Sequence, residues 1–410
     1  MNTADLLNFG LYLASFKLNQ WKSPEEIKKI QEKKLRRIIS VAKNSVPYYR
    51  KSLSGMESLS LDSISRLPVL EKAAIAQNPE SFINETARNL IERPTSGSAG
   101  MPLKIVIGAD GLYGLALRYH CMTEAGFGPL DVLINTLSFP LYQSFPQRFV
   151  YRIMNLSPFE DERNMLKSIR SVRSGIFFGY PSTLTLLSAL NSGSPGQVSL
   201  KCIITTSETL TPRLRTGAEK SFACRVRDYY GSNECGVMAF ECEKGSLHAI
   251  SDSAIIEIVD DEGQPAESGS VLVTSLWRTS MPFIRYRLGD SAVFRGKCRC
   301  GRASPAISVE GRESRFVILP SGMKFIWAKI QMRLKSVEGV LGFQCIQEDN
   351  ETLSFRLVPS GRPSPDIAEK VRATALSALP EPMDVKVGWA EKIGREKSGK
   401  VTDFIPLRGA

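Results

Sequence analysis

The sequence predicts an α/β fold with a smaller α+β module at its C-terminal end, and two observations lead to this prediction. In the middle of the chain, apolar runs typical of buried strands alternate with helix-like segments. Beyond about Gly311, helical stripes and strand-like runs form a pattern of their own. In a chain of 410 residues we therefore expect a large multi-sheet domain over residues 1–311 and a small, mobile domain over residues 312–410.

The first clear helix has a recognisable start. Ser23 is a suitable N-cap, Pro24 occupies the first helical position, and Glu26 follows three residues after the cap, which is typical of a capping box. Apolar side chains recur at helical spacing behind this start, at Ile27, Ile30, Leu35, Ile38 and Ala42. A basic cluster lies on the same helix, formed by Lys28, Lys29, Lys33, Lys34, Arg36 and Arg37. We interpret it as a solvated face.

The expected strands in the middle of the chain are apolar runs over 131–137, 201–206, 225–230, 254–260 and 270–276. The last two flank an Asp-Glu-Gly-Gln-Pro turn over 261–265, which predicts a hairpin-like connection. In the C-terminal module, apolar stripes predict helices over 326–337 and 367–379, and strand-like runs cover 340–346, 352–358 and 384–389.

Composition and charge narrow the class of protein. The net charge of +11 would suit nucleic acid, or a small polyanion such as ATP or coenzyme A. Because the basic residues are dispersed, we expect no nucleic-acid partner, and a zinc-stabilised nucleic-acid-binding protein is a distant alternative. The apolar stretch over 6–16 is too short to span a bilayer, and the eight cysteines are spread widely. We expect a cytoplasmic protein with no membrane span.

A run of hydroxyls and glycines is the first candidate functional segment: Thr95, Ser96, Gly97, Ser98, Ala99 and Gly100. Glycines let the backbone approach an anion closely, and the hydroxyls add donors beside backbone N–H groups. The run therefore indicates a phosphate-binding loop, although such a composition is also that of an ordinary surface turn.

Further motifs follow this loop in order along the chain. They are Tyr230-Gly231-Ser232-Asn233-Glu234, Tyr286-Arg287-Leu288-Gly289-Asp290, Gly311-Arg312 and Ser398-Gly399-Lys400. Each alone is typical of a common turn. Together with the 95–100 loop and the segments over 46–50, 179–182 and 281–287, they resemble the adenylate-forming (acyl-CoA synthetase) superfamily, most closely its phenylacetate-CoA ligase-like branch. The resemblance covers nearly the whole chain.

This resemblance implies a two-step ligase reaction. A carboxylate attacks the α-phosphorus of ATP to give an acyl-adenylate and pyrophosphate, and the thiol of coenzyme A then displaces AMP. It implies that Glu234 ligates Mg²⁺, Asp290 accepts from the ribose hydroxyls, Arg312 adds a charged contact, and Lys400 reaches the α-phosphate and carboxylate oxygens. The other residues implied to meet ATP are Thr95, Ser96, Gly97, Ser98, Gly100, Ser207, Glu208, Tyr229, Tyr230, Gly231 and Ser232.

The acid pocket implied by the resemblance is bordered by Phe139, Tyr142, Tyr180 and Met238. Aromatic walls favour an aryl or arylalkyl acid. Two positions depart from the family pattern: Ala99 replaces a hydroxyl residue in the loop, and Ser314 occupies the hinge between the domains. The acceptor is open, because the branch also includes enzymes that transfer AMP to a cofactor hydroxyl or feed an amine or carrier protein. We expect a monomer or homodimer.

A Cys/His set forms a second candidate site. Cys298 and Cys300 stand one residue apart, too close for a relaxed disulfide but suited to ligate one ion. Cys242 and His248 would complete a tetrahedral zinc site, and His248 is one of only two histidines in the chain. With four protein ligands and no open position, such a zinc would be structural. Similar pairs hold a structural zinc in the branch that the chain resembles.

Overall fold

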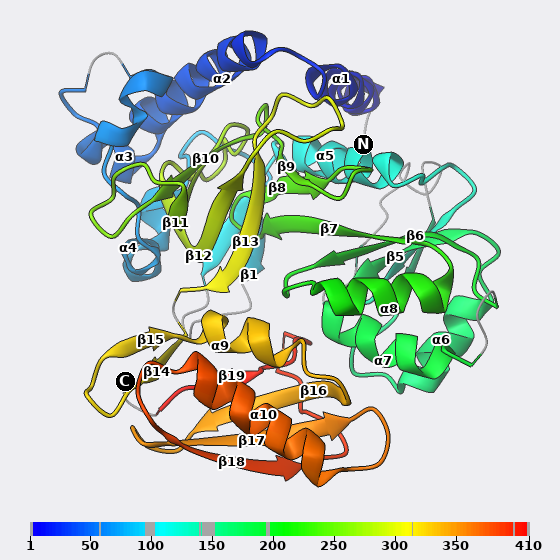
Figure 1. The fold of residues 1–410 in the computed structure, drawn as a ribbon. Helices are drawn as coiled ribbons and strands as arrows, with labels where there is room; N and C mark the ends of the chain where they lie inside the picture. The colour runs from blue at the N-terminus through cyan, green and yellow to red at the C-terminus, as the bar shows by residue number, and fades with distance from the viewer. Residues whose placement is uncertain are drawn as a thin grey trace. The chain divides into compact units, whose positions relative to one another are not determined.

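The structure is a computed structural model that describes residues 3–56, 59–94, 103–138, 141, 152–193, 197–313, 315–396 and 398–407. These residues form two compact units (Figure 1). The first unit comprises described residues of 3–129 and 227–310, and the second comprises those of 130–141, 152–226 and 311–407. Within the described ranges, no helix is long and apolar enough to cross a membrane.

The first unit begins with helices α1 (Thr3–Asn19), α2 (Pro24–Ser45) and α3 (Pro47–Ser52). The predicted capping box of α2 is confirmed: Glu26 N donates to Ser23 Oγ over 3.3 Å, and Ser23 N donates to Glu26 Oε2 over 3.0 Å. Three short helical segments and a longer helix follow, η1 (Leu61–Arg66), α4 (Lys72–Gln77), η2 (Pro79–Phe82) and α5 (Gly111–Glu124).

The strands of the first unit are joined mainly by antiparallel pairing. A separate ribbon pairs β1 (Ile91–Pro94) with β2 (Lys104–Ile107). A larger run has the order β10-β11-β12-β13-β9-β8-β7. These strands are β7 (Arg225–Ser232), β8 (Gly236–Glu241), β9 (Leu247–Ala249), β10 (Ala254–Val259), β11 (Ser268–Ser275), β12 (Tyr286–Arg295) and β13 (Ala306–Arg312). The predicted connection between β10 and β11 is an antiparallel hairpin, as expected.

The second unit contains a parallel sheet with the strand order β6-β5-β3-β4. Its strands are β3 (Val132–Asn135), β4 (Arg152–Asn155), β5 (Gly175–Gly179) and β6 (Leu200–Thr206). Helices α6 (Glu162–Arg170), α7 (Pro181–Asn191) and α8 (Pro212–Phe222) pack against it, with Leu166, Leu184 and Phe222 in the shared core (Figure 1). The carboxyl ends of parallel strands meet at one edge, so residues that follow β3, β5 and β6 gather there.

The C-terminal part of the second unit confirms the predicted α+β pattern. A mixed sheet has the order β18-β17-β16-β19, and α9 and α10 contribute to the same core. The elements are β14 (Phe316–Ile318), β15 (Lys324–Ile326), α9 (Trp327–Leu334), β16 (Val340–Gln347), β17 (Thr352–Pro359), α10 (Pro365–Ala378), β18 (Asp384–Trp389) and β19 (Phe404–Ile405). A mobile domain over 312–410 stays a prediction; in the structure these residues belong to the same compact unit as 152–226.

The buried ring of Trp327 stacks on Phe404 at a centroid distance of 4.5 Å, so Trp327→Ala should leave a cavity in the C-terminal core. We expect a loss of about 3–5 kcal/mol of stability. Urea unfolding, followed by hydrogen exchange of the β16 and β17 peptides, measures it. The matched control is Met332→Ala on the exposed face of the same helix, which should cost less than about 0.5 kcal/mol. Equal losses would contradict the assigned core.

Candidate active site and metal centre

The carboxyl edge of the parallel sheet gathers several residues that the sequence singled out. Tyr180 follows β5 directly, and Ser207 and Glu208 follow β6. Ser207 has φ of +71°, in the left-handed region that residues with a side chain rarely adopt. Strained backbone of this kind clusters at functional sites, because surrounding structure must hold it in place. The predicted nucleotide and acid residues of this unit thus lie at one edge.

The Glu208 carboxylate ties three segments together at this edge. It accepts hydrogen bonds from Ser182 N over 2.8 Å and from Ser182 Oγ over 3.0 Å, at the start of α7. It also accepts one from Val401 N over 3.3 Å, near the C-terminal end of the chain. The resemblance implies that Glu208 meets ATP, and its bridge between Ser182 and Val401 is not visible in the sequence.

Tyr180 supplies a second tie to the same C-terminal segment. Its hydroxyl donates to the carbonyl oxygen of Ser398 over 2.9 Å and lies 3.3 Å from Ser138 Oγ, just beyond β3. Burial raises the pKa of the Tyr180 hydroxyl, so it remains a protonated donor at neutral pH. The segment over 398–401 is therefore held against the ends of neighbouring strands.

Lys400 lies in a tight turn within this segment. Gly399 N donates to Glu396 O over 2.8 Å, and Glu396 N donates to Lys400 O over 2.9 Å. Gly399 has φ of +75°, and a Cβ there would lie only 2.6 Å from Pro158 Cγ, so glycine is required. We call residue 396 together with residues 398–401 the Lys400 turn. Its place at the carboxyl edge is an observation, whereas the catalytic role of Lys400 stays a prediction.

In the first unit, a turn between β7 and β8 carries the predicted magnesium ligand. Ser232 Oγ accepts from Cys235 N over 3.0 Å, which closes the turn around Glu234. Gly236 has φ of +72°, and a Cβ on it would meet the Trp277 ring at 2.7 Å. The Tyr286 hydroxyl donates to Glu234 Oε1 over 3.4 Å. Local backbone geometry and one long hydrogen bond thus position the carboxylate.

The predicted ribose-binding residue lies in the same unit. Asp290, on β12, accepts a hydrogen bond of 2.8 Å at Oδ2 from the hydroxyl of Tyr230, on β7. The structure therefore brings together two residues from separate motifs of the sequence. Arg312 is the half-buried last residue of β13 and belongs to the second unit.

Three predicted site residues, Tyr180, Met238 and Tyr229, are buried instead of forming exposed walls. Met238 is fully buried in the main core cluster of the first unit. Tyr229 is buried against Phe240, and this burial raises the pKa of its hydroxyl. Their predicted roles, lining the acid pocket or contacting ATP, stay predictions, because a buried side chain presents no exposed surface to a ligand.

Several predicted residues lie outside the described part of the chain. They are Thr95, Ser96, Gly97, Ser98, Ala99, Gly100, Phe139, Tyr142 and Ser314. The strands that border the hydroxyl and glycine run are described, and Pro94 of β1 pairs with Lys104 of β2. The candidate phosphate loop is thus framed by an antiparallel ribbon.

The predicted Cys/His set converges in the first unit. The ligand atoms of Cys242, His248, Cys298 and Cys300 all lie within 4.8 Å of one another. The Cys242 and Cys298 Sγ atoms are 3.7 Å apart, and Cys300 Sγ lies 3.3 Å from His248 Nε2. Tetrahedral zinc with bonds of about 2.3 Å separates two sulfur atoms by about 3.8 Å. The donor set and its spacing fit zinc.

Hydrogen bonds from neighbouring groups orient the ring of His248 and stabilise negative charge on the cysteine sulfur atoms, as a cation site requires. His248 Nδ1 donates to Ser304 O over 2.9 Å, which directs the lone pair of Nε2 toward the cluster. Lys244 N and Arg302 N each donate to a cysteine sulfur over 3.4 Å. Hydrogen bonding, first from Ser246, lowers the pKa of the Cys298 thiol to about 6, so the thiolate predominates at neutral pH.

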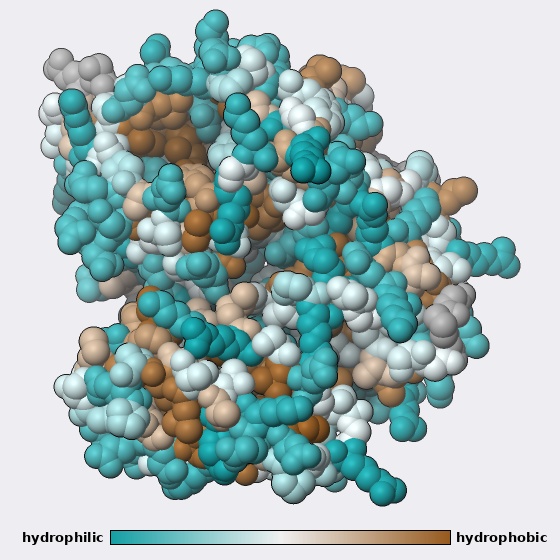
Figure 2. All heavy atoms as spheres, in the orientation of Figure 1, coloured by the Kyte–Doolittle hydropathy of each residue, from teal (hydrophilic) through white to brown (hydrophobic). Residues whose placement is uncertain are grey.

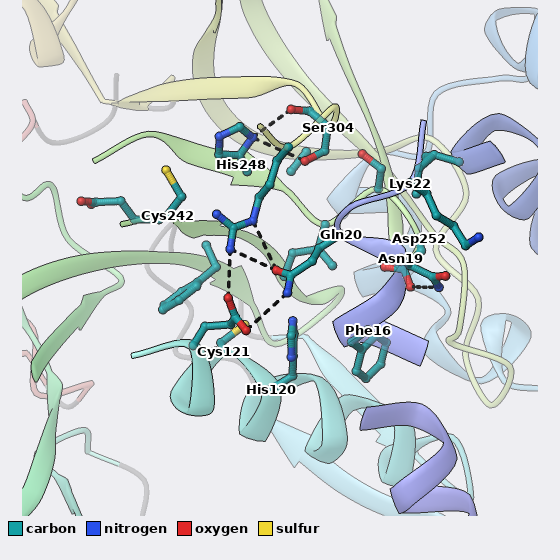
Figure 3. A pocket seen from close by; sticks show the side chains of 18 residues that line it. Phe16, Asn19, Gln20, Lys22, His120, Cys121, Cys242, His248, Asp252 and Ser304 are labelled. Carbon is teal, nitrogen blue, oxygen red and sulfur yellow. Dashed lines mark hydrogen bonds and ion pairs between the residues drawn. The ribbon is translucent and has the colours of Figure 1, made fainter. Parts of the chain in front are cut away.

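The side chain of Arg302 joins the cysteine-bearing loop to the N-terminal helices, a link that the sequence alone did not reveal. It donates to Glu124 Oε2 over 2.9 Å, on α5, and to Gln20 Oε1 over 3.1 Å, just after α1. Its guanidinium also lies 4.8 Å from the centre of the Trp21 ring. These contacts border a cavity of about 50 Å³ that Gln20, His120 and His248 help to line (Figure 3).

Comparison with known proteins gives relatives at low identity. No protein-family model matches the chain. It is 23% identical over 347 residues to protein CapK of Staphylococcus aureus, covering 76% of this chain and 72% of that protein. It is 25% identical over 305 residues to a phenylacetate-coenzyme A ligase of Thermus thermophilus, covering 68% of each. An indoleacetate–lysine synthetase of Pseudomonas savastanoi is 26% identical over 242 residues, covering 57% of each.

Solved structures share the fold. A 2-hydroxyisobutyryl-CoA ligase, crystallised in the postadenylation state with 2-HIB-AMP, matches with a TM-score of 0.79 at 19% identity, covering 95% of this chain and 91% of that one. An anthranilate CoA ligase in complex with anthranoyl-AMP matches with a TM-score of 0.60 at 17% identity, covering 77% and 65%.

The fold is that of AMP-forming ligases, and the curated relatives include a ligase of this class. More particularly, the chain is similar to phenylacetate-CoA ligase-like members of the adenylate-forming superfamily, as the ordered motifs of the sequence indicated.

The Cys/His set predicts about one zinc per purified chain, measured by elemental analysis. Cys300→Ser should lower that content at least tenfold because it removes a thiolate ligand. Cys224→Ser, at a half-buried cysteine outside the set, is the matched control and should retain the metal. A fully folded, metal-free wild-type chain would refute the site.

Removing the metal should also loosen the junction between α1 and α2, because Arg302 follows Cys300 closely and contacts Gln20 and Trp21. We expect amide exchange over residues 18–24 to rise severalfold after chelation, measured by mass spectrometry. Peptides of α10, in the second unit, are the internal control and should not change. Unchanged exchange over 18–24 in metal-free protein would rule out this coupling.

Proposed function

We propose that this adenylate-forming ligase activates an aromatic carboxylic acid with ATP and transfers the acyl group to coenzyme A. The first step joins the acid carboxylate to the α-phosphorus of ATP and releases pyrophosphate. In the second step the thiol of coenzyme A attacks the acyl carbon and releases AMP. Known relatives that are acid–CoA ligases support this order of events.

The observation that carries the proposal is the position of the Lys400 turn on the carboxyl edge of the parallel sheet. Tyr180 and Glu208 hold the turn there through Ser398 O and Val401 N. Ligands of parallel α/β sheets bind outside this edge. A lysine cation held there would neutralise the charge that develops on the α-phosphate during acid attack.

The remaining roles follow the predicted assignments. Glu234 would hold Mg²⁺, whose preferred ligands are carboxylate and phosphate oxygens. Asp290, oriented by Tyr230, would accept hydrogen bonds from the ribose hydroxyls, and Arg312 would add a charge-assisted contact. The hydroxyl and glycine residues of the 95–100 loop would bind the β- and γ-phosphates. Zinc at the Cys/His set would be structural, since four protein ligands leave no open position.

The aromatic class of the acid rests on the relatives and structural neighbours that act on aryl acids, because the predicted wall residue Tyr180 is buried. Phenylacetate, indoleacetate and anthranilate are aryl acids, and 2-hydroxyisobutyrate is not. A pyrophosphate-release screen over matched aryl and branched aliphatic acids tests this class directly. Release with aliphatic acids alone would overturn the aromatic assignment while leaving adenylation intact.

An amine is the second candidate acceptor, because the indoleacetate–lysine synthetase is among the relatives. The same screen therefore runs with coenzyme A, with lysine and with neither. If the adenylate is consumed only in the presence of lysine, the acceptor is an amine and not the thiol of coenzyme A.

Lys400→Ala should lower acid-dependent exchange of labelled pyrophosphate into ATP by about 100-fold or more, because a preorganised cation is lost from the adenylation step. Thioester formation from a supplied acyl-adenylate should change less than about threefold. Lys392→Ala, at an exposed lysine of the same C-terminal segment, is the matched control. Equal loss in both half-reactions would contradict the role given to Lys400.

A further inference from the structure

Helix α1 is apolar on two opposite faces. One face packs on α5: Phe16 contacts Tyr113 at a ring distance of 5.0 Å, and Phe9 contacts Tyr119 at 5.8 Å. The opposite face carries apolar residues at spacings of three and four, namely Ala4, Leu7, Leu11, Ala14 and Leu18. We call this second set the outer stripe.

The outer stripe lies in solvent within the described unit. Leu7 is 67% exposed, Leu11 is 66% exposed and Leu18 is 68% exposed, and Trp21, just beyond the helix, is 54% exposed. Single exposed leucines are normal on a protein surface, but a contiguous stripe over four helical turns marks an interaction surface. Figure 2 shows apolar side chains gathered over α1 at the upper edge of the molecule.

Basic side chains lie on α2, the helix that follows α1 in the chain. The two helices are joined by residues 20–23, and each packs its other face into the first unit (Figure 1). The solvent face of α2 presents Lys29, Lys33 and Arg37. Two further cations of this face, Lys28 and Arg36, already pair with Asp62 and Glu32. The two N-terminal helices therefore present an exposed apolar stripe on α1 and exposed cations on α2, in a chain whose net charge is +11.

We propose that the outer stripe docks into the interfacial region of an anionic lipid bilayer, with α1 lying in the membrane plane. The leucines would enter the boundary between headgroups and acyl chains, and Trp21 would lie at headgroup level. Lys29, Lys33 and Arg37 would contact anionic headgroups. This inference concerns where the enzyme acts and does not depend on the proposed reaction.

A second copy of the chain fits the stripe less well. The apolar spacing covers about two heptads, fewer than the three to four that sustain a coiled coil. The outer stripe of a second copy is also uncharged, so pairing through α1 would supply no opposite charge for the exposed cations of α2. An anionic bilayer would bury the leucines of the outer stripe and would also supply negative headgroups for the cations of α2.

Vesicle co-sedimentation of the full chain tests the proposal. One vesicle set is phosphatidylcholine alone, and the other is phosphatidylcholine with about a quarter phosphatidylglycerol. We expect binding to the anionic set, weakened by about 0.5 M salt, which shortens the screening length. Leu11→Gln should weaken partitioning about tenfold, and the triple change Leu7→Gln, Leu11→Gln and Leu18→Gln should abolish it.

Matched variants separate the two components of the surface. Leu130→Gln, at a leucine of the second unit that is 81% exposed, should leave binding unchanged. Changing Lys29, Lys33 and Arg37 to Gln should weaken binding to anionic vesicles tenfold or more, because each change removes one cation that is attracted to the anionic headgroups. Because all these positions are exposed, thermal unfolding should not shift, and it serves as the check on folding.

Three outcomes would overturn the proposal. They are no binding to either vesicle set, binding that survives the triple leucine change, and a dimer in sedimentation velocity that the triple change dissociates while vesicles bind nothing. The last outcome would assign the outer stripe to a second copy of the chain.

Discussion

One carboxylate organises the part of the molecule where chemistry is expected. Glu208 follows the last residue of a parallel strand, and it accepts from the backbone and side chain of Ser182 and from the backbone of Val401. These partners begin a neighbouring helix and end the Lys400 turn. The carboxyl edge and the turn that carries the predicted catalytic lysine thus share one anchor, and hydrogen bonds to a charged acceptor are stronger than those to a neutral one.

Sequence reasoning found the elements whose signals are local. The capping residues of α2, the hairpin between β10 and β11 and the α+β pattern after Gly311 all follow from spacing and turn chemistry. It also assembled the Cys/His set, because ligand types and short spacings are visible in the chain. The links made by Glu208 and Arg302 were missed, since each joins segments far apart in sequence and neither residue carries a local mark of its partners.

The Cys/His set and the N-terminal helices form a second organised region. Arg302 extends from the cysteine-bearing loop to Gln20 and Trp21, and its paired carboxylate, Glu124, lies on the helix against which α1 packs. A structural ion at this place would thereby stabilise more than its own loop. It would also fix the orientation of the helix whose outer stripe faces solvent.

The tie between Glu208 and Val401 uses a backbone N–H and no side chain of the turn. A net contribution of about 0.5–1.5 kcal/mol for an ordinary hydrogen bond, or about 1.5–3 kcal/mol when one partner is charged, gives an equilibrium bias of roughly two- to 150-fold. Such a bias favours the docked Lys400 turn, and the hydrogen bond from the Tyr180 hydroxyl to Ser398 O adds to it. Because the donor is a backbone N–H, any residue except proline at position 401 can make this hydrogen bond, and the tie constrains the path of the chain without constraining the side chain at that position.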